Sequence, residues 1–203
     1  MQAFRLAPAG RPVRILDLGA NVGYFSLRCA ALHCQARPGA PLEIFAVEGS
    51  SRLFGELQER AARSAPSGVT LTLKHGLVGR RSGKAMFHSS LFSSCTNAVS
   101  RDANVSSNPL RNNYAEECEY LDLDTVIAPG TELDLIKCDI EGSELEFLQA
   151  YPDLLGRARS LVVELHPLEC DTPTCRDLLK TYGFARQRVI KELPTHSQEM
   201  YIR

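Results

Sequence analysis

Short apolar runs alternate along the chain with longer segments whose apolar residues recur every three or four positions. The first pattern is typical of strands buried on both faces, and the second of amphipathic helices. Strands are predicted at residues 13–18, 42–47, 69–73, 133–140 and 161–165. Helices are predicted at 22–32, from Ser50 or Ser51 through Ala61, at 143–150, and from a Thr172 cap with Pro173 at the first position to Gly183. This alternation predicts an α/β fold with a mostly parallel sheet.

The C-terminal part of the pattern differs. Apolar segments at 184–190 and 199–202 flank a turn near His196, while residues 121–127 form only a short helical or turn element. Parallel neighbours need a long crossover connection, so the two close segments predict an antiparallel hairpin.

Residues 80–118 carry many Ser and Asn side chains and few apolar anchors. A connection of this length inside a compact domain is usually a functional lid or a disordered insert. We find no internal repeat and no second domain. The expectation is one domain over residues 1–203, with a polar insert or lid at about 80–118.

Composition narrows the class of partner. The chain has 23 Lys and Arg against 24 Asp and Glu, for a net charge of −1. A net charge this small gives no overall electrostatic attraction to nucleic acid or to an anionic membrane. No apolar run approaches the ~18 to 20 residues of a membrane span, and the N-terminus lacks a signal-peptide core. The seven cysteines, never spaced C-x-x-C, argue against a zinc site and a disulfide scaffold. We expect a cytoplasmic protein without nucleic-acid or membrane partners.

The most informative motif lies where the first strand turns into the first helix, where residues 17–24 are D-L-G-A-N-V-G-Y. Ligands of open α/β sheets bind next to the carboxyl ends of the strands, which together form the carboxyl edge of the sheet. Glycines there allow a ligand to approach the backbone closely. The dinucleotide fingerprint G-x-G-x-x-G is not met, because Asn21 and Tyr24 stand where its second and third glycines would fall. Asp17 suits a cationic ligand, such as the amino group of a methionine moiety.

Glu48 ends the second predicted strand, where a carboxylate can accept both hydroxyls of a ribose. Together with the glycine motif it indicates S-adenosylmethionine. The candidate cofactor-binding residues are Asp17, Gly19, Asn21, Gly23, Tyr24, Glu48, Gly49 and Leu77. The structural alternatives are that Asp17 and Glu48 cap helix N-termini and that Tyr24 packs in the core.

With these motifs the chain resembles the class I S-adenosylmethionine-dependent methyltransferases, and within them the FkbM family. The matching segments are 15–26, 46–48, 121–125, 162–166 and above all 134–148, D-L-I-K-C-D-I-E-G-S-E-L-E-F-L. They run in family order from about residue 13 to the C-terminus, whereas the Ser/Asn-rich segment matches no landmark. The resemblance implies a Rossmann-like, seven-stranded sheet and methyl transfer, usually to an oxygen of a small molecule or sugar.

The candidate reactive groups are Asp139, Glu141 and His166, which follow the fourth and fifth predicted strands. Methyl transfer is an in-line displacement governed by positioning, but an alcohol acceptor also needs a base or a metal. Two carboxylates and an imidazole could hold a divalent metal, although this set is too generic to name one and we assign no metal ligand. Each residue also has an explanation without a catalytic role. Asp139 could be structural, Glu141 could be present because negative side chains stabilise the first turn of a helix, and His166 could be an exposed loop histidine.

The sequence lacks the Asn/Asp-Pro-Pro-aromatic run of amide methylation, the Pro-Cys pair of cytosine C5 chemistry and an evident Lys-Asp-Lys-Glu tetrad. The favoured function is therefore methylation of a hydroxyl on a small molecule or glycan. A dinucleotide-dependent oxidoreductase and a non-catalytic cofactor-binding or interaction module stay open. The sequence identifies neither the acceptor nor the oligomeric state.

Overall fold

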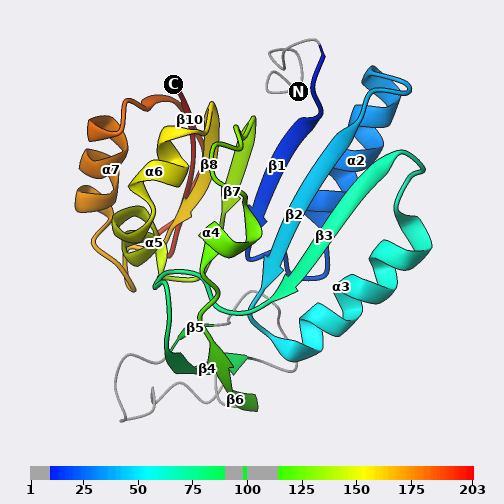
Figure 1. The fold of residues 1–203 in the computed structure, drawn as a ribbon. Coiled ribbons are helices and arrows are strands. Elements are labelled where there is room, and N and C mark those ends of the chain that lie inside the picture. Colours follow the sequence, from blue (N-terminus) through cyan, green and yellow to red (C-terminus); the bar gives the residue numbers. More distant parts are fainter. Residues whose placement is uncertain (1–9, 90–97, 100–113) are drawn as a thin grey trace.

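The structure, a computed structural model, describes residues 10–89, 98–99 and 114–203. Its main element is a seven-stranded sheet in the order β3-β2-β1-β7-β8-β10-β9 (Figure 1). The parallel strands are β1 (Val13–Leu18), β2 (Leu42–Glu48), β3 (Val69–His75), β7 (Leu135–Cys138) and β8 (Ser160–Leu165). The C-terminal strands β9 (Ala185–Glu192) and β10 (Ser197–Ile202) are antiparallel to each other, and β10 is antiparallel to β8. The predicted Rossmann-like fold with a C-terminal hairpin is confirmed.

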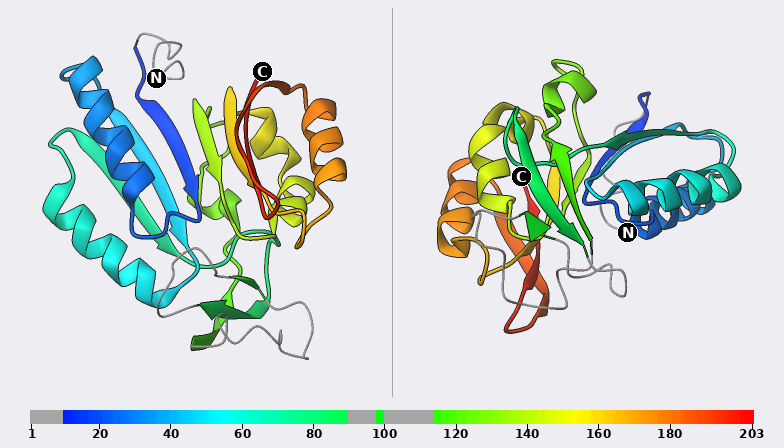
Figure 2. Two further views of the ribbon diagram at one scale, coloured as in Figure 1. Left: turned by 180° about the vertical axis from the view of Figure 1, so that it is seen from behind. Right: turned by 90° about the horizontal axis from the view of Figure 1, so that it is seen from below.

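Helices cover both faces of this sheet because the strands bury side chains on both sides (Figures 1 and 2). Val13 and Ile15 of β1 pack with Cys29 and Ala30 of α2 (Tyr24–Ala36), and α3 (Ser51–Ser64) continues the same layer. On the other face lie the helices α4 (Leu123–Val126), α5 (Glu144–Ala150), α6 (Pro152–Gly156) and α7 (Thr172–Thr181). No described helix is long and apolar enough to cross a membrane.

Helix boundaries follow local capping chemistry. Ser50 caps α3, its hydroxyl accepting a hydrogen bond from the Leu53 N–H. The cap of α7 is Asp171, not the predicted Thr172, because the Asp171 carboxylate accepts the Thr174 N–H at 3.2 Å. The first helix begins at Tyr24, two residues later than predicted, because Gly23 is in a left-handed conformation.

The region expected to be a polar insert contains a second, three-stranded antiparallel sheet in the order β5-β4-β6. Its strands are β4 (Lys84–Ser89), β5 (Ala98–Val99) and β6 (Tyr114–Glu119). Phe87 and Cys118 pack with Leu77 and Tyr120 in a small core of their own. Residues 90–97 and 100–113, which carry most of the Ser and Asn residues, lie outside the described residues. The small sheet lies at the carboxyl edge of the main sheet (Figure 1).

Candidate functional site

A cleft of about 530 Å³, measured with its open mouth, lies at the carboxyl edge of the main sheet. β1 lies between β2 and β7, so the strand order reverses there: β2 and β3 are added on one side of β1, and β7 and β8 on the other. Open α/β sheets bind ligands at such a point. The lining residues are Gly19, Asn21, Val47, Glu48, Gly49, Gly76, Leu77, Val78, Phe87, Asp139, Ile140, Glu141 and Ser143.

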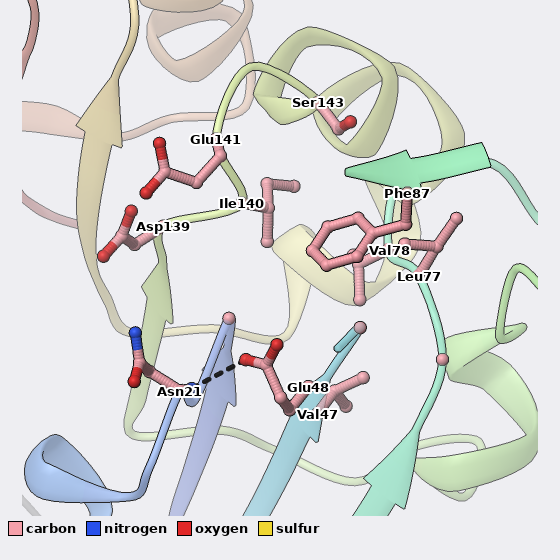
Figure 3. A pocket seen from close by; sticks show the side chains of 13 residues that line it. Asn21, Val47, Glu48, Leu77, Val78, Phe87, Asp139, Ile140, Glu141 and Ser143 are labelled. Carbon is pink, nitrogen blue, oxygen red and sulfur yellow. Dashed lines mark hydrogen bonds between the residues drawn. The ribbon is translucent and has the colours of Figure 1, made fainter. Parts of the chain in front are cut away.

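Glu48 lies at the end of β2, only 5% exposed. Its Oε2 accepts the Asn21 N–H at 2.7 Å (Figure 3). Its Oε1 accepts the Ser50 N–H at 2.8 Å. Burial raises the pKa of this carboxyl, against the lowering effect of the two N–H donors. Each carboxylate oxygen can accept more than one hydrogen bond, so this group can also bind hydroxyls in the cleft. Glu48 is therefore a buried group and not an exposed strand end.

Gly19 is required by the protein's own backbone. It has a φ of +71°, and a Cβ on it would lie 1.8 Å from the Asp139 carbonyl oxygen. A side chain here would force apart the turns that follow β1 and β7. This glycine therefore brings Asn21 and Asp139 to one cleft, which the glycine motif alone did not specify.

Asp17 does not line the cleft. It is fully buried, accepts a hydrogen bond from the Ser26 hydroxyl at 2.6 Å, and lies 3.5 Å from the Lys137 ammonium. Lys137 also donates to the carbonyl oxygens of Leu18 and Gly19, at 3.2 and 2.6 Å. Burial would lower the pKa of Lys137, but the charges of Asp17 and Asp139 raise it. The expectation that Asp17 faces a cationic ligand is corrected, because a lysine of the same chain is its cation.

Asp139 and Glu141 lie on the wall of the cleft opposite Glu48, and their carboxylates point toward each other (Figure 3). They occupy the turn between β7 and α5, where Glu141 is left-handed with a φ of 51°. His166, just after β8, is buried behind this wall, and its Nε2 lies 3.4 Å from Glu141 Oε2. The three predicted reactive residues are therefore neighbours, but only the two carboxylates line the cleft.

The electrostatics of this wall are unusual. Burial raises the pKa of Glu141 to about 8, against the lowering effect of His166. Burial would lower the pKa of His166, but its hydrogen bond to Glu144 and the charges of Glu144, Glu141 and Asp139 raise it to about 9. A carboxylate with a pKa near the working pH is suited to proton transfer.

Like Asp17, two further predicted cofactor-binding residues lie apart from the cleft. Tyr24 is 72% exposed at the start of α2, and the guanidinium of Arg60 lies 5.2 Å from its ring centroid. Gly23 packs against α3, where a Cβ would lie 2.6 Å from Leu57 Cδ1. Gly19, Asn21, Glu48, Gly49 and Leu77 do line the cleft.

The sequence prediction missed the apolar lining residues Val78, Phe87 and Ile140. The alternation of Lys84, Met86 and His88 with Ala85 and Phe87 was the available signal for the strand that carries Phe87. It also missed Glu144 as the partner of His166, because a glutamate is common at the start of any helix.

Neither a protein-family model nor a curated protein sequence matches this chain. Solved structures do match. The FkbM methyltransferase of Methylobacillus flagellatus has a TM-score of 0.59 at 16% identity, over 98% of this chain and 45% of that one. The present chain thus corresponds to less than half of that protein.

Two smaller methyltransferases match over more of their length. The precorrin-6y C5,15-methyltransferase of Geobacter metallireducens gives a TM-score of 0.54 at 14% identity, over 100% of this chain and 84% of that one. The magnesium protoporphyrin IX methyltransferase of Synechocystis, with bound S-adenosylhomocysteine, gives 0.52 at 13% identity, over 95% and 74%. At these identities the comparisons show the class I methyltransferase fold.

Proposed function

We propose that this protein transfers a methyl group from S-adenosylmethionine to a hydroxyl oxygen of a small molecule or glycan. The observation that carries the proposal is the cleft at the switch point of the sheet, with Glu48 on one wall and Asp139 and Glu141 on the other. Methyltransferases of known structure share the fold, and one of them was solved with S-adenosylhomocysteine. The FkbM resemblance of the sequence supports an oxygen acceptor.

The residues of the cleft fit this cofactor. Glu48 offers a buried carboxylate whose protein partners are two backbone N–H groups, the acceptor set that a ribose diol needs. Leu77, Val78 and Ile140 provide an apolar wall suited to an adenine ring. When bound, S-adenosylmethionine would supply a methyl group activated by its positive sulfur. An acceptor oxygen would form a bond to the methyl carbon in line with the carbon–sulfur bond, which breaks with its electron pair going to sulfur.

The carboxylates of Asp139 and Glu141 are the groups placed to take the proton of the acceptor hydroxyl. His166 does not line the cleft, so we assign it to positioning Glu141 rather than to touching the acceptor. The small sheet contributes Phe87 to the cleft and is proposed to cover the acceptor side during transfer.

The test is formation of S-adenosylhomocysteine with a panel of hydroxylated acceptors, each paired with its amine analogue. Glu141→Gln and Asp139→Asn are expected to lower turnover by about a hundredfold or more, with cofactor affinity measured separately. The matched control is Glu146→Gln on α5, whose carboxylate pairs with Arg80 outside the cleft lining. Methylation of the amines alone, or normal turnover by both variants, would contradict the assignment.

We also propose that the protein is located in the cytoplasm. It is supported by the cysteines Cys29, Cys34, Cys118, Cys138, Cys170 and Cys175, all free thiols. Unpaired cysteines are typical of proteins in reducing compartments.

A further inference from the structure

Behind the cleft wall, carboxylates from three elements surround one imidazole. Glu141 Oε2 and Glu164 Oε1 lie 3.4 and 3.7 Å from His166 Nε2, and Glu144 Oε1 lies 2.9 Å from Nδ1. Asp139 completes the group: one carboxylate oxygen each from Asp139 and Glu164 and one His166 nitrogen all lie within 4.8 Å of one another. Unlike the fully buried Asp17, Asp139 is partly exposed at the cleft, so it can take a second cation beside the Lys137 ammonium at 3.4 Å. These residues come from the turn after β7, from β8 and from its end, so the sheet itself fixes their spacing.

The imidazole is oriented by a buried carboxylate. Glu144 is fully buried, and its Oε1 accepts the Gly142 N–H at 3.1 Å as well as the bond from His166 Nδ1. An ionised carboxylate is only an acceptor, so Nδ1 carries a hydrogen, and Nε2, which binds a metal only after losing its own proton, is aimed at Glu141 and Glu164. The side chain of His166 is 9% exposed, and among the described residues neither carboxylate is within good hydrogen-bonding geometry of Nε2. A histidine that donates one nitrogen to a carboxylate and presents the other is the usual arrangement of a metal ligand.

We propose that Asp139, Glu164 and His166 bind a divalent cation. Ligand atoms on one such ion at about 2.1 to 2.4 Å lie roughly 3 Å apart when adjacent and up to about 4.5 Å apart when opposite. The spread of 4.8 Å therefore needs only a small inward movement of side chains.

The donor set indicates the kind of metal. Carboxylate oxygens suit Mg²⁺ and Mn²⁺, and an imidazole favours a first-row transition ion over Mg²⁺. A mixed set of two carboxylates and one imidazole therefore favours Mn²⁺ over Mg²⁺. Asp139 lines the cleft, so the ion would lie in its wall. With the ion bound, Asp139 is one of its ligands and Glu141 is the group that takes the acceptor proton. The role of the ion in lowering the pKa of an acceptor hydroxyl rests on the proposed function, whereas binding of the ion does not.

Binding is tested without cofactor or acceptor, on the full chain after removal of metals by chelation. Calorimetric titration with Mn²⁺ is expected to show one site per chain, bound at least tenfold more tightly than Mg²⁺. Glu164→Gln and His166→Ala are each expected to weaken Mn²⁺ binding at least tenfold. Glu146→Gln, which removes a carboxylate of α5 that pairs with Arg80, is the matched control and should bind normally.

Pulsed electron paramagnetic resonance of the Mn²⁺ complex gives a second readout on the unaltered protein. We expect the Mn²⁺ signal to show coupling to one imidazole ¹⁴N nucleus. Loss of this coupling in a folded His166 variant would identify His166 as the ligand. Absence of Mn²⁺ binding, absence of nitrogen coupling, or binding unchanged by Glu164→Gln would overturn the proposal. Methyl transfer that continues in chelator would leave the proposed function intact, so the two ideas fail separately.

Discussion

Lys137 and Asp17 show how a residue's surroundings decide its role. Both sequence motifs that contain them are associated with ligand binding, yet β1 and β7 place the two residues side by side in parallel register. Register is not visible in the sequence, since it depends on which strands become neighbours. Glu48 and Asp139, by contrast, were predictable because each follows directly from the end of an apolar run.

Removal of Lys137 is expected to destabilise the fold. Lys137→Met leaves the fully buried Asp17 carboxylate without its cation and should lower the free energy of unfolding by about 3 to 5 kcal/mol. Urea denaturation measures this, with Lys191→Met, an exposed lysine on β9, as the control. Adding Asp17→Asn should recover part of the loss. A Lys137→Met protein as stable as the control would show that the pair is not a structural unit.

Glu48 is expected to determine cofactor affinity. Glu48→Gln replaces one acceptor oxygen by an amide that faces a backbone N–H, so the variant should bind S-adenosylhomocysteine at least tenfold more weakly and also lose stability. Titration below the melting temperature separates the two effects. Glu199→Gln, another buried glutamate with several partners, should lose stability but bind normally. Equal affinity of Glu48→Gln and the unaltered protein would move the ribose elsewhere.

At the scale of elements, strands buried on both faces were predictable. β1 has the predicted bounds, and β2 and β8 differ by one residue, because a short continuous apolar run fits a buried strand and is too short for a typical helix. β4 and β6 were missed, since charged residues such as Lys84, Glu117 and Glu119 mask a strand with only one apolar face. β7 is shorter than the predicted strand 133–140 at both ends, and the left-handed Glu141 and Gly142 belong to the turn that follows it.

The contact between the C-terminal hairpin and α7 depends on Glu199. Its carboxylate accepts hydrogen bonds from Arg176 at 2.7 Å and from the Tyr201 and Ser197 hydroxyls at 2.6 and 2.8 Å. Burial would raise the pKa of Glu199, but these donors lower it below the ordinary value. A lowered pKa in the folded state adds stability above the unfolded value of about 4.3, and that stability is lost as the pH falls through the folded value.

Glu199→Gln is therefore expected to be less stable than the unaltered protein at pH 7, by about 3 kcal/mol. The difference should shrink progressively as the pH is lowered below about 4.5. Thermal or urea unfolding from pH 7 to pH 3 measures it. A difference that stays constant over that range would mean that the charge of Glu199 does not stabilise the hairpin.

At the scale of the whole molecule, the order of the strands places Glu48 on one side of a cleft and the carboxylates of Asp139 and Glu141 on the other. β1 is central, β2 brings Glu48 from one side, and β7 brings Asp139 from the other. This arrangement was predictable from the alternation of strands and helices together with the resemblance. The contribution of the small sheet was not, because it depends on pairing between segments separated by the Ser/Asn-rich residues.

The central claim is that this cleft binds the methyl-donor cofactor. The most direct test is a calorimetric and thermal-unfolding titration of the unaltered protein with S-adenosylhomocysteine, and in parallel with NAD⁺. We expect saturable binding of S-adenosylhomocysteine, and at a hundred times its dissociation constant a stabilisation of about 2.7 kcal/mol, with no effect of NAD⁺. An unchanged melting temperature in S-adenosylhomocysteine, together with a rise in NAD⁺, would contradict the account.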